Sequence, residues 1–246
     1  MQSPKVEQTL GKAPGFRRRF RITPMQQQVR CEVEDDFHCM AVTVEHDGEV
    51  ATAIEPSMQR APWTTCPGAI EQLKTAFVGV ALTAFPLQGS SHKQQNCTHL
   101  YDLALLAANH AFDSDESVYD IFVSDPIDGQ RTAELHTKGA VILSWTESDF
   151  KIVLPEEMAG ILLFNMREWI DALPPQQQEM ARLLRWANMI ANGRTIPIEQ
   201  QSDATQMPPN CYTFQPQRAP TAKRVGEIVD FSDGLRQPLD NCGENH

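Results

Sequence analysis

The sequence predicts an α+β fold in which an antiparallel β-sheet system carries helices packed on it, followed by a helical C-terminal portion and an extended tail. Apolar and polar residues alternate within residues 16–55 and again within 118–154, which is typical of antiparallel strands with one buried face. Between these stretches, apolar residues recur at helical spacing. We therefore expect a flexible arm at 1–15, a single α+β domain at 16–195, and a tail at 196–246 that docks on the domain.

The first β stretch divides into four predicted strands. His46-Asp47-Gly48 indicates a hairpin turn, because glycine readily adopts the positive φ that a tight turn requires. We expect Thr23-Pro24 to end the first strand and Pro56 to end the last one, since proline cannot donate a hydrogen bond to a strand ladder. The strands are expected at 16–22, 29–33, 39–45 and 50–54.

Two helices are predicted in the middle of the sequence. The first, at about 68–79, follows from the spacing of its apolar residues. The second, at about 97–112, begins after a predicted loop at 88–96, and Asn96 or Thr98 can cap it. The predicted buried stripes are Ile70, Leu73, Phe77 and Val80 in the first helix, and Leu100, Leu103, Leu106 and Ala107 in the second.

The second β stretch and two more helices complete the predicted domain. Asp125-Pro-Ile-Asp-Gly129 and Thr146-Glu-Ser-Asp149 are expected turns between strands. The helices are expected at about 156–173 and 175–191, divided by Pro174-Pro175, and Gly193 should stop the second one. The strands are expected at 118–123, 131–137, 140–146 and 150–154.

The composition argues against several classes of partner. The 246 residues carry 21 Lys+Arg against 32 Asp+Glu, and a net charge of −11 disfavours nucleic acid or an anionic membrane as the main partner. No apolar run approaches the roughly 20 residues of a membrane span, and the N-terminus lacks the apolar region of a signal peptide. A cytoplasmic protein is expected. Phe16-Arg-Arg-Arg-Phe-Arg21 is locally basic and fits an exposed strand or, alternatively, a patch for a carboxylate or phosphate.

The six cysteines are expected to be reduced thiols. They are scattered along the sequence without CxxC pairs, so their spacing does not indicate a disulfide framework. Their positions are Cys31, Cys39, Cys66, Cys97, Cys211 and Cys242.

Reactive side chains concentrate in residues 60–110, where loops meet helices. Free backbone N–H groups at a helix start favour anions and thiolates, so Cys66 is a candidate reactive or site-lining thiol. Its alternative is a small buried residue packed under Trp63. Cys97 and His99 lie at the start of the second helix, and Cys97 is a candidate for the lining of a binding site.

Histidines supply the candidate acid–base groups. His99 is followed three residues later by Asp102, a spacing that lets the carboxylate orient its ring. His38 follows Asp35-Asp36 in a short connection, where a carboxylate would favour its charged form, although a solvated turn is an equal alternative. His110 and His46 are expected to have structural roles, His46 within its turn.

Other residue types suit substrate binding. Arg60 can hold a carboxylate or phenolate through its planar guanidinium. Trp63, Tyr101 and Tyr212 can stack on an aromatic ring, with core packing as the alternative. Cys66, Cys97, His99 and His38 are zinc-compatible types but lack short ligand spacing, so no cofactor is expected, with zinc as the alternative. Walker A, GxGxxG, GxSxG and HExxH motifs are absent.

Three separated motifs carry a family resemblance. They are Arg60-Ala-Pro-Trp-Thr-Thr-Cys66-Pro-Gly-Ala69, Cys97-Thr-His99-Leu and Cys211-Tyr-Thr-Phe214. With the acidic pair before His38 and Arg-Ile-Thr at 21–23, they resemble a bacterial domain-of-unknown-function family, DUF2889, over roughly residues 16–235. The resemblance implies similarity to small accessory enzymes of aromatic and acyl catabolism, and no agreed reaction.

Two classes of function remain open at this point. The first is a cofactor-independent lyase, for example formaldehyde-releasing, or a hydratase, acting on a small anionic aromatic catabolic intermediate such as a lignin-derived phenylpropanoid. A Cys-dependent hydrolase or thioesterase is its alternative within the enzyme class. The second is a non-catalytic ligand-binding or zinc-binding module, in which the apolar helices within 156–191 form a partner face or close a homodimer.

Overall fold

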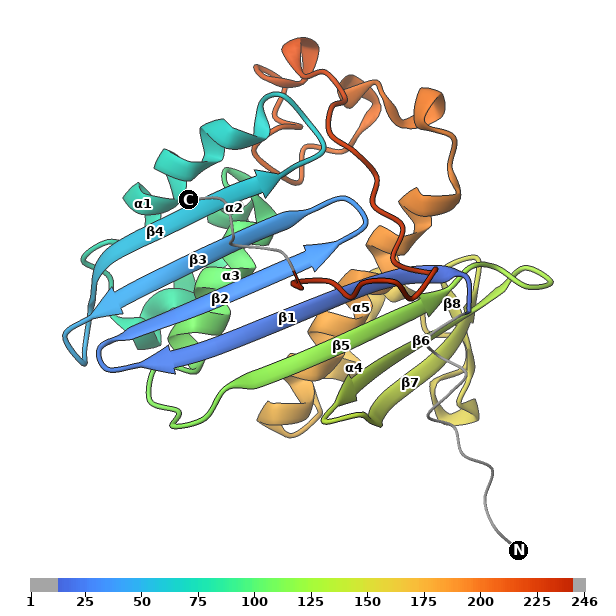
Figure 1. The fold of residues 1–246 in the computed structure, drawn as a ribbon, viewed down its shortest axis with the longest axis horizontal. Coiled ribbons are helices and arrows are strands. Elements are labelled where there is room, and N and C mark those ends of the chain that lie inside the picture. The colour runs from blue at the N-terminus through green and yellow to red at the C-terminus, as the bar shows by residue number, and fades with distance from the viewer. Residues whose placement is uncertain (1–12, 241–246) are drawn as a thin grey trace, which may run out of the picture. The chain divides into compact units, whose positions relative to one another are not determined.

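The computed structural model describes residues 13–240, apart from the side chains of residues 88–91. The predicted arm at 1–15 therefore lies almost wholly outside the described residues. The protein divides into two compact units. The first, here called the 19–118 unit, consists of Arg19–Val118, Ile198–Val229 and the residues from Pro238 onward. The second, here called the 119–197 unit, consists of Tyr119–Pro197, Asp230–Gln237 and the residues up to Arg18. Within residues 13–240, eight strands and the helices beside them confirm the α+β class (Figure 1).

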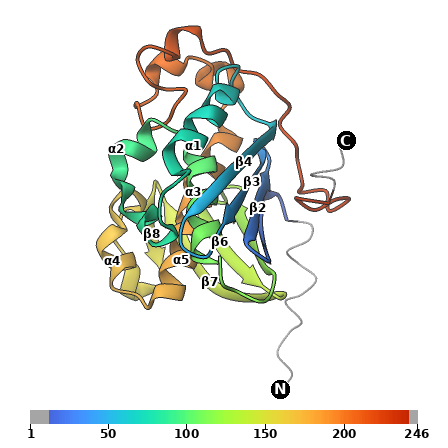
Figure 2. The ribbon, with the colours of Figure 1, turned by 90° about the vertical axis from the view of Figure 1, so that its left-hand side faces the viewer.

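The 19–118 unit has a sheet in the order β4-β3-β2-β1. Its strands are β1 (Gly15–Met25), whose first four residues belong to the other unit, β2 (Gln28–Asp35), β3 (Cys39–His46) and β4 (Ala51–Arg60). The β2–β3 and β3–β4 pairs are antiparallel. Helix α1 (Ala69–Phe77) packs on β4, and α3 (Thr98–Asn109) packs on β2 and β3 (Figure 2).

The core of this unit explains why its helices hold their positions. Leu100, Leu103 and Ala107 of the predicted stripe are 0% exposed, and Leu106 is buried. Phe77, at the end of α1, lies 4.3 Å from Phe85 between ring centroids. Burial of such side chains is the main force that fixes an amphipathic helix on a sheet.

Two predicted strand ends are wrong. Strand β1 continues through Thr23-Pro24 to Met25, and β4 continues through Pro56 to Arg60. Pro56 lies opposite Val42 of β3, and β4 is the last strand in the order, where a residue without an N–H is tolerated on the open side. The predicted loop at 88–96 is also wrong in part, because it contains the short helix α2 (Gly89–Gln94) after a 3-10 segment at Leu82–Gln88.

The 119–197 unit contains the second sheet region, in the order β5-β6-β7-β8, and α5 packs on it. The elements are β5 (Ser117–Ser124), β6 (Gln130–Thr137), β7 (Ala140–Ser148), β8 (Lys151–Leu154), α4 (Arg167–Asp171) and α5 (Pro175–Thr195). Helix α5 contacts β6 and β7. The buried Trp145 Nε1–H of β7 donates to Asn188 Oδ1 of α5 at 2.7 Å, which ties the helix to the sheet.

The helices of this unit differ from the prediction. The range 156–173 is not one helix, because Gly160 has a φ of 90° and the backbone forms 3-10 segments at Glu156–Met158 and Leu163–Asn165 before α4. Helix α5 passes Gly193 and ends at Thr195. Its last turn is held by Arg194, which pairs with Asp125 at 3.0 Å and with Asp230 at 3.1 Å.

The basic stretch at 16–21 is not an exposed strand. Phe16 and Phe20 are 0% exposed, and Arg18 is 1% exposed with its guanidinium over the Trp186 ring at 4.5 Å. Arg21 pairs with Glu32 at 2.7 Å. Arg18 is thus packed against an aromatic ring and Arg21 is ion-paired, each within its own unit. The segment is therefore structural and does not offer an open patch for a carboxylate or phosphate.

The tail segment that contains Cys211–Phe214 packs within the 19–118 unit. Tyr212 N–H donates to the carbonyl of Asn96 at 2.9 Å, and the Phe214 ring meets the Trp63 ring edge-on at 5.7 Å. Figure 1 shows this part of the tail, in orange and red, beside the end of β4. Among the described residues, no helix combines the length and the apolar character needed to cross a bilayer.

Candidate functional site

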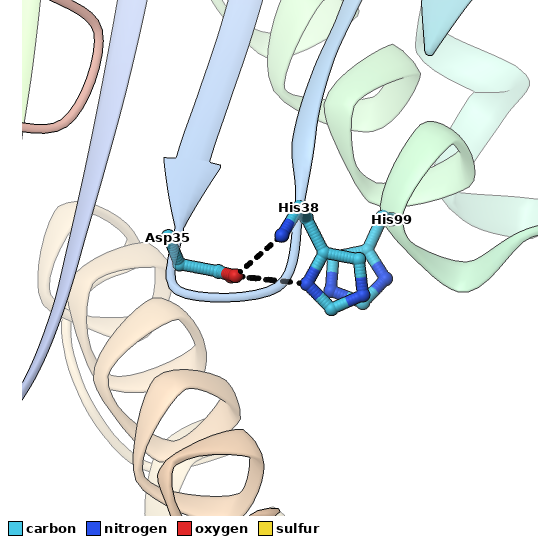
Figure 3. A group of neighbouring side chains, drawn as sticks. All are labelled: Asp35, His38 and His99. Atoms are coloured by element: carbon cyan, nitrogen blue, oxygen red, sulfur yellow. Dashed lines mark hydrogen bonds and ion pairs between the residues drawn. The ribbon is translucent and has the colours of Figure 1, made fainter. Parts of the chain in front are cut away.

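The turn between β2 and β3 is built around the carboxylate of Asp35. Its Oδ1 accepts a hydrogen bond from Phe37 N at 2.8 Å. It also accepts hydrogen bonds from His38 N at 2.8 Å and from His38 Nδ1 at 2.9 Å (Figure 3). Asp35 is 0% exposed, and His38 is 7% exposed. An ionised carboxylate can only accept hydrogen bonds, so this geometry places a ring proton of His38 on Nδ1; when the ring is neutral, the lone pair is on Nε2.

His99 joins this turn from the first turn of α3. Its ring stacks on the His38 ring, with the centroids 3.8 Å apart and the planes 27° from parallel (Figure 3). His99 is also buried. Because α3 packs on β2 and β3, its N-terminal turn reaches the β2–β3 connection, and the two predicted histidines lie in one site.

The carboxylate partner predicted for His99 is wrong. Asp102 instead binds Lys93, whose Nζ lies 2.5 and 2.6 Å from its two carboxylate oxygens. The ion pair with a neighbouring lysine fixes Asp102 away from the histidines. The carboxylate of the histidine pair is Asp35, which reaches His38 directly.

The cluster does not fit zinc in this arrangement. Asp35, His38 and His99 each offer one ligand atom within 4.8 Å of the others, and Cys66 and Cys97 do not belong to this group. However, imidazole binds metals through a lone pair in its ring plane, and stacked rings direct their lone pairs along nearly parallel planes. One ion would have to lie far out of plane for at least one ring. Asp35 Oδ1 already accepts three hydrogen bonds.

Cys66 and Cys97 are buried and protonated rather than reactive thiolates. Burial raises the pKa of the Cys66 thiol, and a hydrogen-bonding contact with Thr213 Oγ1 at 3.4 Å opposes this only in part. Burial, with Cys66 nearby, also raises the pKa of Cys97. The predicted helix-start stabilisation of a thiolate is wrong, because Cys66 opens only a three-residue 3-10 turn and desolvation dominates.

The cysteines also differ from expectation in their redox state. Cys39 is disulfide-bonded, whereas Cys31, Cys66, Cys97 and Cys211 are free. The expectation of reduced thiols is therefore wrong at Cys39. Sequence spacing alone does not reveal which sulfur atoms a fold brings together.

Arg60 does not reach the histidine pair. It lies opposite Cys39 in the β3–β4 register, and its Nη2 donates to Glu34 Oε1 at 2.8 Å. Glu34 and Asp35 are consecutive in β2, and consecutive side chains of a strand point to opposite faces. Arg60 is therefore on the face opposite to Asp35 and does not point toward the histidine pair, and its role as a substrate anchor stays a prediction.

The predicted aromatic residues separate into different environments. Tyr101 is buried against Phe77, with ring centroids 4.9 Å apart, and burial with nearby Asp102 raises its pKa to about 12. Tyr212 is covered by Arg218, whose guanidinium carbon lies 3.8 Å from the ring centroid. Both have structural contacts. Trp63 is buried, and the guanidinium of Arg224 lies over its ring.

Arg224 lies over two aromatic rings near the histidine pair. Its guanidinium carbon lies 5.6 Å from the centroid of the Phe37 ring and 5.4 Å from that of the Trp63 ring. The Phe37 ring in turn meets the His38 ring edge-on at 6.2 Å. Burial lowers the pKa of Arg224, which nearby Cys66 opposes. Arg224 lies in a tail without periodicity, so no local signal could have found it.

His46 and His110, for which structural roles were expected, have structural positions. His110 Nδ1 lies 2.6 Å from Asp113 Oδ2 at the end of α3. His46 is buried against Phe112, with ring centroids 5.8 Å apart. In the hairpin turn, Asp47 Oδ1 accepts hydrogen bonds from the backbone N–H groups of Glu49 and Val50. The turn role expected for His46 therefore belongs to Asp47.

The comparison with known families agrees with the motifs. Residues 18–113 match the family described as Protein of unknown function (DUF2889). This confirms the predicted resemblance over that range, which contains Asp35, His38 and His99. The motif at Cys211–Phe214 and Arg224 lie beyond the matched residues. No curated protein matches the sequence.

Proposed function

We propose that the protein is a cofactor-independent lyase or hydratase that acts on a small anionic aromatic compound, with His38 and His99 as its acid–base groups. The observation that supports this proposal is the buried Asp35–His38–His99 cluster. A carboxylate that orients one imidazole nitrogen leaves the other nitrogen ready to accept a proton. Such an arrangement is typical of general bases.

The stacked ring of His99 limits the cluster to one positive charge at a time. Two imidazolium rings with centroids 3.8 Å apart would repel strongly in a buried site. When His38 Nε2 takes a proton, Asp35 stabilises the resulting charge, and His99 remains neutral. His99 can then donate or accept a hydrogen bond at the same substrate, which makes it the second acid–base group.

A concrete reaction is the release of formaldehyde from a para-phenolic compound with a hydroxymethyl side chain, such as a lignin-derived phenylpropanoid. Loss of a benzylic hydroxyl as water first gives a quinone methide. His38 then takes the alcohol proton, the oxygen electron pair forms the C=O of formaldehyde, and the C–C bond breaks. The electron pair of that bond forms a new C=C bond next to the ring, and the ring regains a phenolic oxygen. Redox balance is kept without an external oxidant.

The alternatives receive less support from the same residues. A thiol hydrolase needs a thiolate, whereas burial raises the pKa of both Cys66 and Cys97. A zinc-binding module needs converging lone pairs, which the stacked rings do not provide. The proposal includes a small-molecule partner, no nucleic acid and no membrane, with a cytoplasmic location; a homodimer remains an expectation.

The test compares His99→Gln and His38→Gln with His110→Gln, a histidine outside the cluster. Hydroxymethyl phenylpropanoids are supplied to the purified proteins, formaldehyde is measured, and thioesters and zinc content are assayed alongside. Loss of a general base typically slows turnover by about 10²–10⁴-fold. We expect that loss in His38→Gln and His99→Gln and near wild-type turnover in His110→Gln. Equal turnover in all three, or stoichiometric zinc in the wild type, would overturn the proposal.

A further inference from the structure

We propose that Arg224 binds the oxyanion of an aromatic ligand, a carboxylate or a phenolate, beside Phe37 and Trp63. This inference rests on the proposed function, because it names the group that would hold the substrate of the histidine pair. It also assigns a role to a tail residue outside the matched family range.

The guanidinium of Arg224 is partly buried without a carboxylate partner among the described residues. In the same unit, Arg21 pairs with Glu32 and Arg60 pairs with Glu34. Arg218, like Arg224, lies over an aromatic ring instead. Removing a charge from water is costly unless it is paired. Two cation–π contacts offset part of that cost, at about 0.5–2 kcal/mol each. A bound anion would supply the missing partner.

The contacts of Arg224 leave its donors available. A guanidinium that lies over aromatic rings uses its face, whereas its five N–H groups lie in its plane. Those groups can form paired hydrogen bonds to the two oxygens of a carboxylate, or a single charge-assisted bond to a phenolate. Phe37 and Trp63 add apolar surface suited to the ring of such a ligand.

The backbone of Arg224 is held in place before any ligand binds. Residues 223–225 form a short antiparallel bridge with residues 62–64. Thr64 N donates to the Lys223 carbonyl at 3.0 Å, and Val225 N donates to the Pro62 carbonyl at 3.0 Å. A binding group on a fixed backbone loses less conformational entropy when it binds, which favours affinity.

The position also suits the histidine pair. Arg224 lies over the Phe37 ring, and that ring is 6.2 Å from the His38 ring between centroids. Both distances are measured from the centroid of the Phe37 ring, so the guanidinium carbon and the centroid of the His38 ring are at most about 12 Å apart. With a hydrogen bond of about 2.9 Å at each end, one aromatic ring and its substituent can bridge this separation. Arg224 is thus a binding and positioning residue, not an acid–base group.

The test measures binding of 3-(4-hydroxyphenyl)propanoate, a probe without the hydroxymethyl group, by calorimetry. Its amide removes the carboxylate, and its phenol methyl ether removes the phenolate. The variants are Arg224→Gln and Arg224→Lys, and the matched control is Arg236→Gln, whose arginine lies over Phe231 at 5.3 Å outside the site. Melting temperatures report folding.

A charge-assisted hydrogen bond contributes about 1.5–3 kcal/mol, which corresponds to roughly a 10–150-fold change in affinity. We expect that loss in Arg224→Gln, a smaller loss in Arg224→Lys, and wild-type affinity in Arg236→Gln. If the wild type binds the amide as weakly as Arg224→Gln binds the probe, Arg224 binds the carboxylate. If the wild type instead binds the methyl ether that weakly, Arg224 binds the phenolate. If Arg224→Gln does not fold, Arg224→Lys decides, because it keeps the charge but not the paired donors.

Two results would overturn the inference: wild-type affinity in both Arg224 variants, or no binding of the probe by the wild type. The proposed function fails separately, when the histidine variants retain turnover although the probe binds in an Arg224-dependent way. Conversely, histidine-dependent turnover with an unchanged KM in Arg224→Gln would keep the proposed function and remove Arg224 from substrate binding.

Discussion

Replacing Asp35 should separate its structural role from its chemical one. In Asp35→Ala, two backbone N–H groups and His38 Nδ1 lose their acceptor in a fully buried turn. Each of these three buried donors left without a partner costs about 1–3 kcal/mol, so the total is about 3–9 kcal/mol. That is a large part of the about 5–15 kcal/mol that stabilises a typical domain. We expect a severely destabilised protein.

Asp35→Asn should retain much of the fold and lose activity. The amide oxygen can still accept from the two backbone N–H groups, which leaves a cost of about 1–2 kcal/mol. However, an NH₂ group replaces Oδ2, which lies 3.2 Å from His38 Nδ1. Two donors would then face each other unless the imidazole changes its tautomer, and the new tautomer has no lone pair at Nε2. Turnover should fall by about 10²–10⁴-fold.

Chemical denaturation, followed by tryptophan fluorescence, measures both variants against the wild type. The matched control is Asp47→Ala, since Asp47 Oδ1 also accepts two backbone N–H bonds, both at 2.9 Å, in an exposed turn. Water can replace an exposed acceptor, so this variant should lose much less stability. A free energy of unfolding for Asp35→Ala no lower than that of Asp47→Ala would refute the reasoning about the buried turn.

Three further predictions concern other parts of the protein. Trp145→Phe removes the buried 2.7 Å bond to Asn188 Oδ1, and the free energy of unfolding should fall by about 1–3 kcal/mol; an unchanged value would show that the bond is dispensable. Burial raises the pKa of Cys211 to about 11, so its alkylation by iodoacetamide should stay slow at pH 8 and accelerate as the pH approaches 11, whereas a midpoint near pH 8.5 would contradict this. In Gly68→Ala the added Cβ would lie 2.7 Å from Tyr212 Oη. The free energy of unfolding should therefore fall by about 1–3 kcal/mol, and the melting temperature should fall with it. A higher melting temperature would count against the tail packing described above.

Local patterns were sufficient for most of the secondary structure. The alternation that predicted strands at 29–33 and 39–45 corresponds to β2 and β3, and the helical spacing near 68–79 corresponds to α1. The turn at Gly48 has the expected positive φ, 104°. Errors arose where packing overrides a local signal, as at Pro56, which an outer strand tolerates.

The candidate site was only partly predictable. The short spacing of Asp35 and His38 pointed to a carboxylate beside the ring, and the two residues are in contact. His99 is far from His38 in the sequence, so its stacking on that ring depends on how α3 packs. The same spacing argument failed for Asp102, because Lys93 competes for its carboxylate.

The sequence by itself determined most of the elements of this protein and the turn that joins Asp35 to His38, because these depend on residues a few positions apart. Only the tertiary structure decided which residues form the site. Burial changes Cys66 from a candidate nucleophile into a protonated thiol, and strand alternation places Arg60 on the opposite face. A tail segment brings Arg224 over Phe37. Desolvation and contact between distant segments are properties of the packed protein, and local sequence patterns do not contain them.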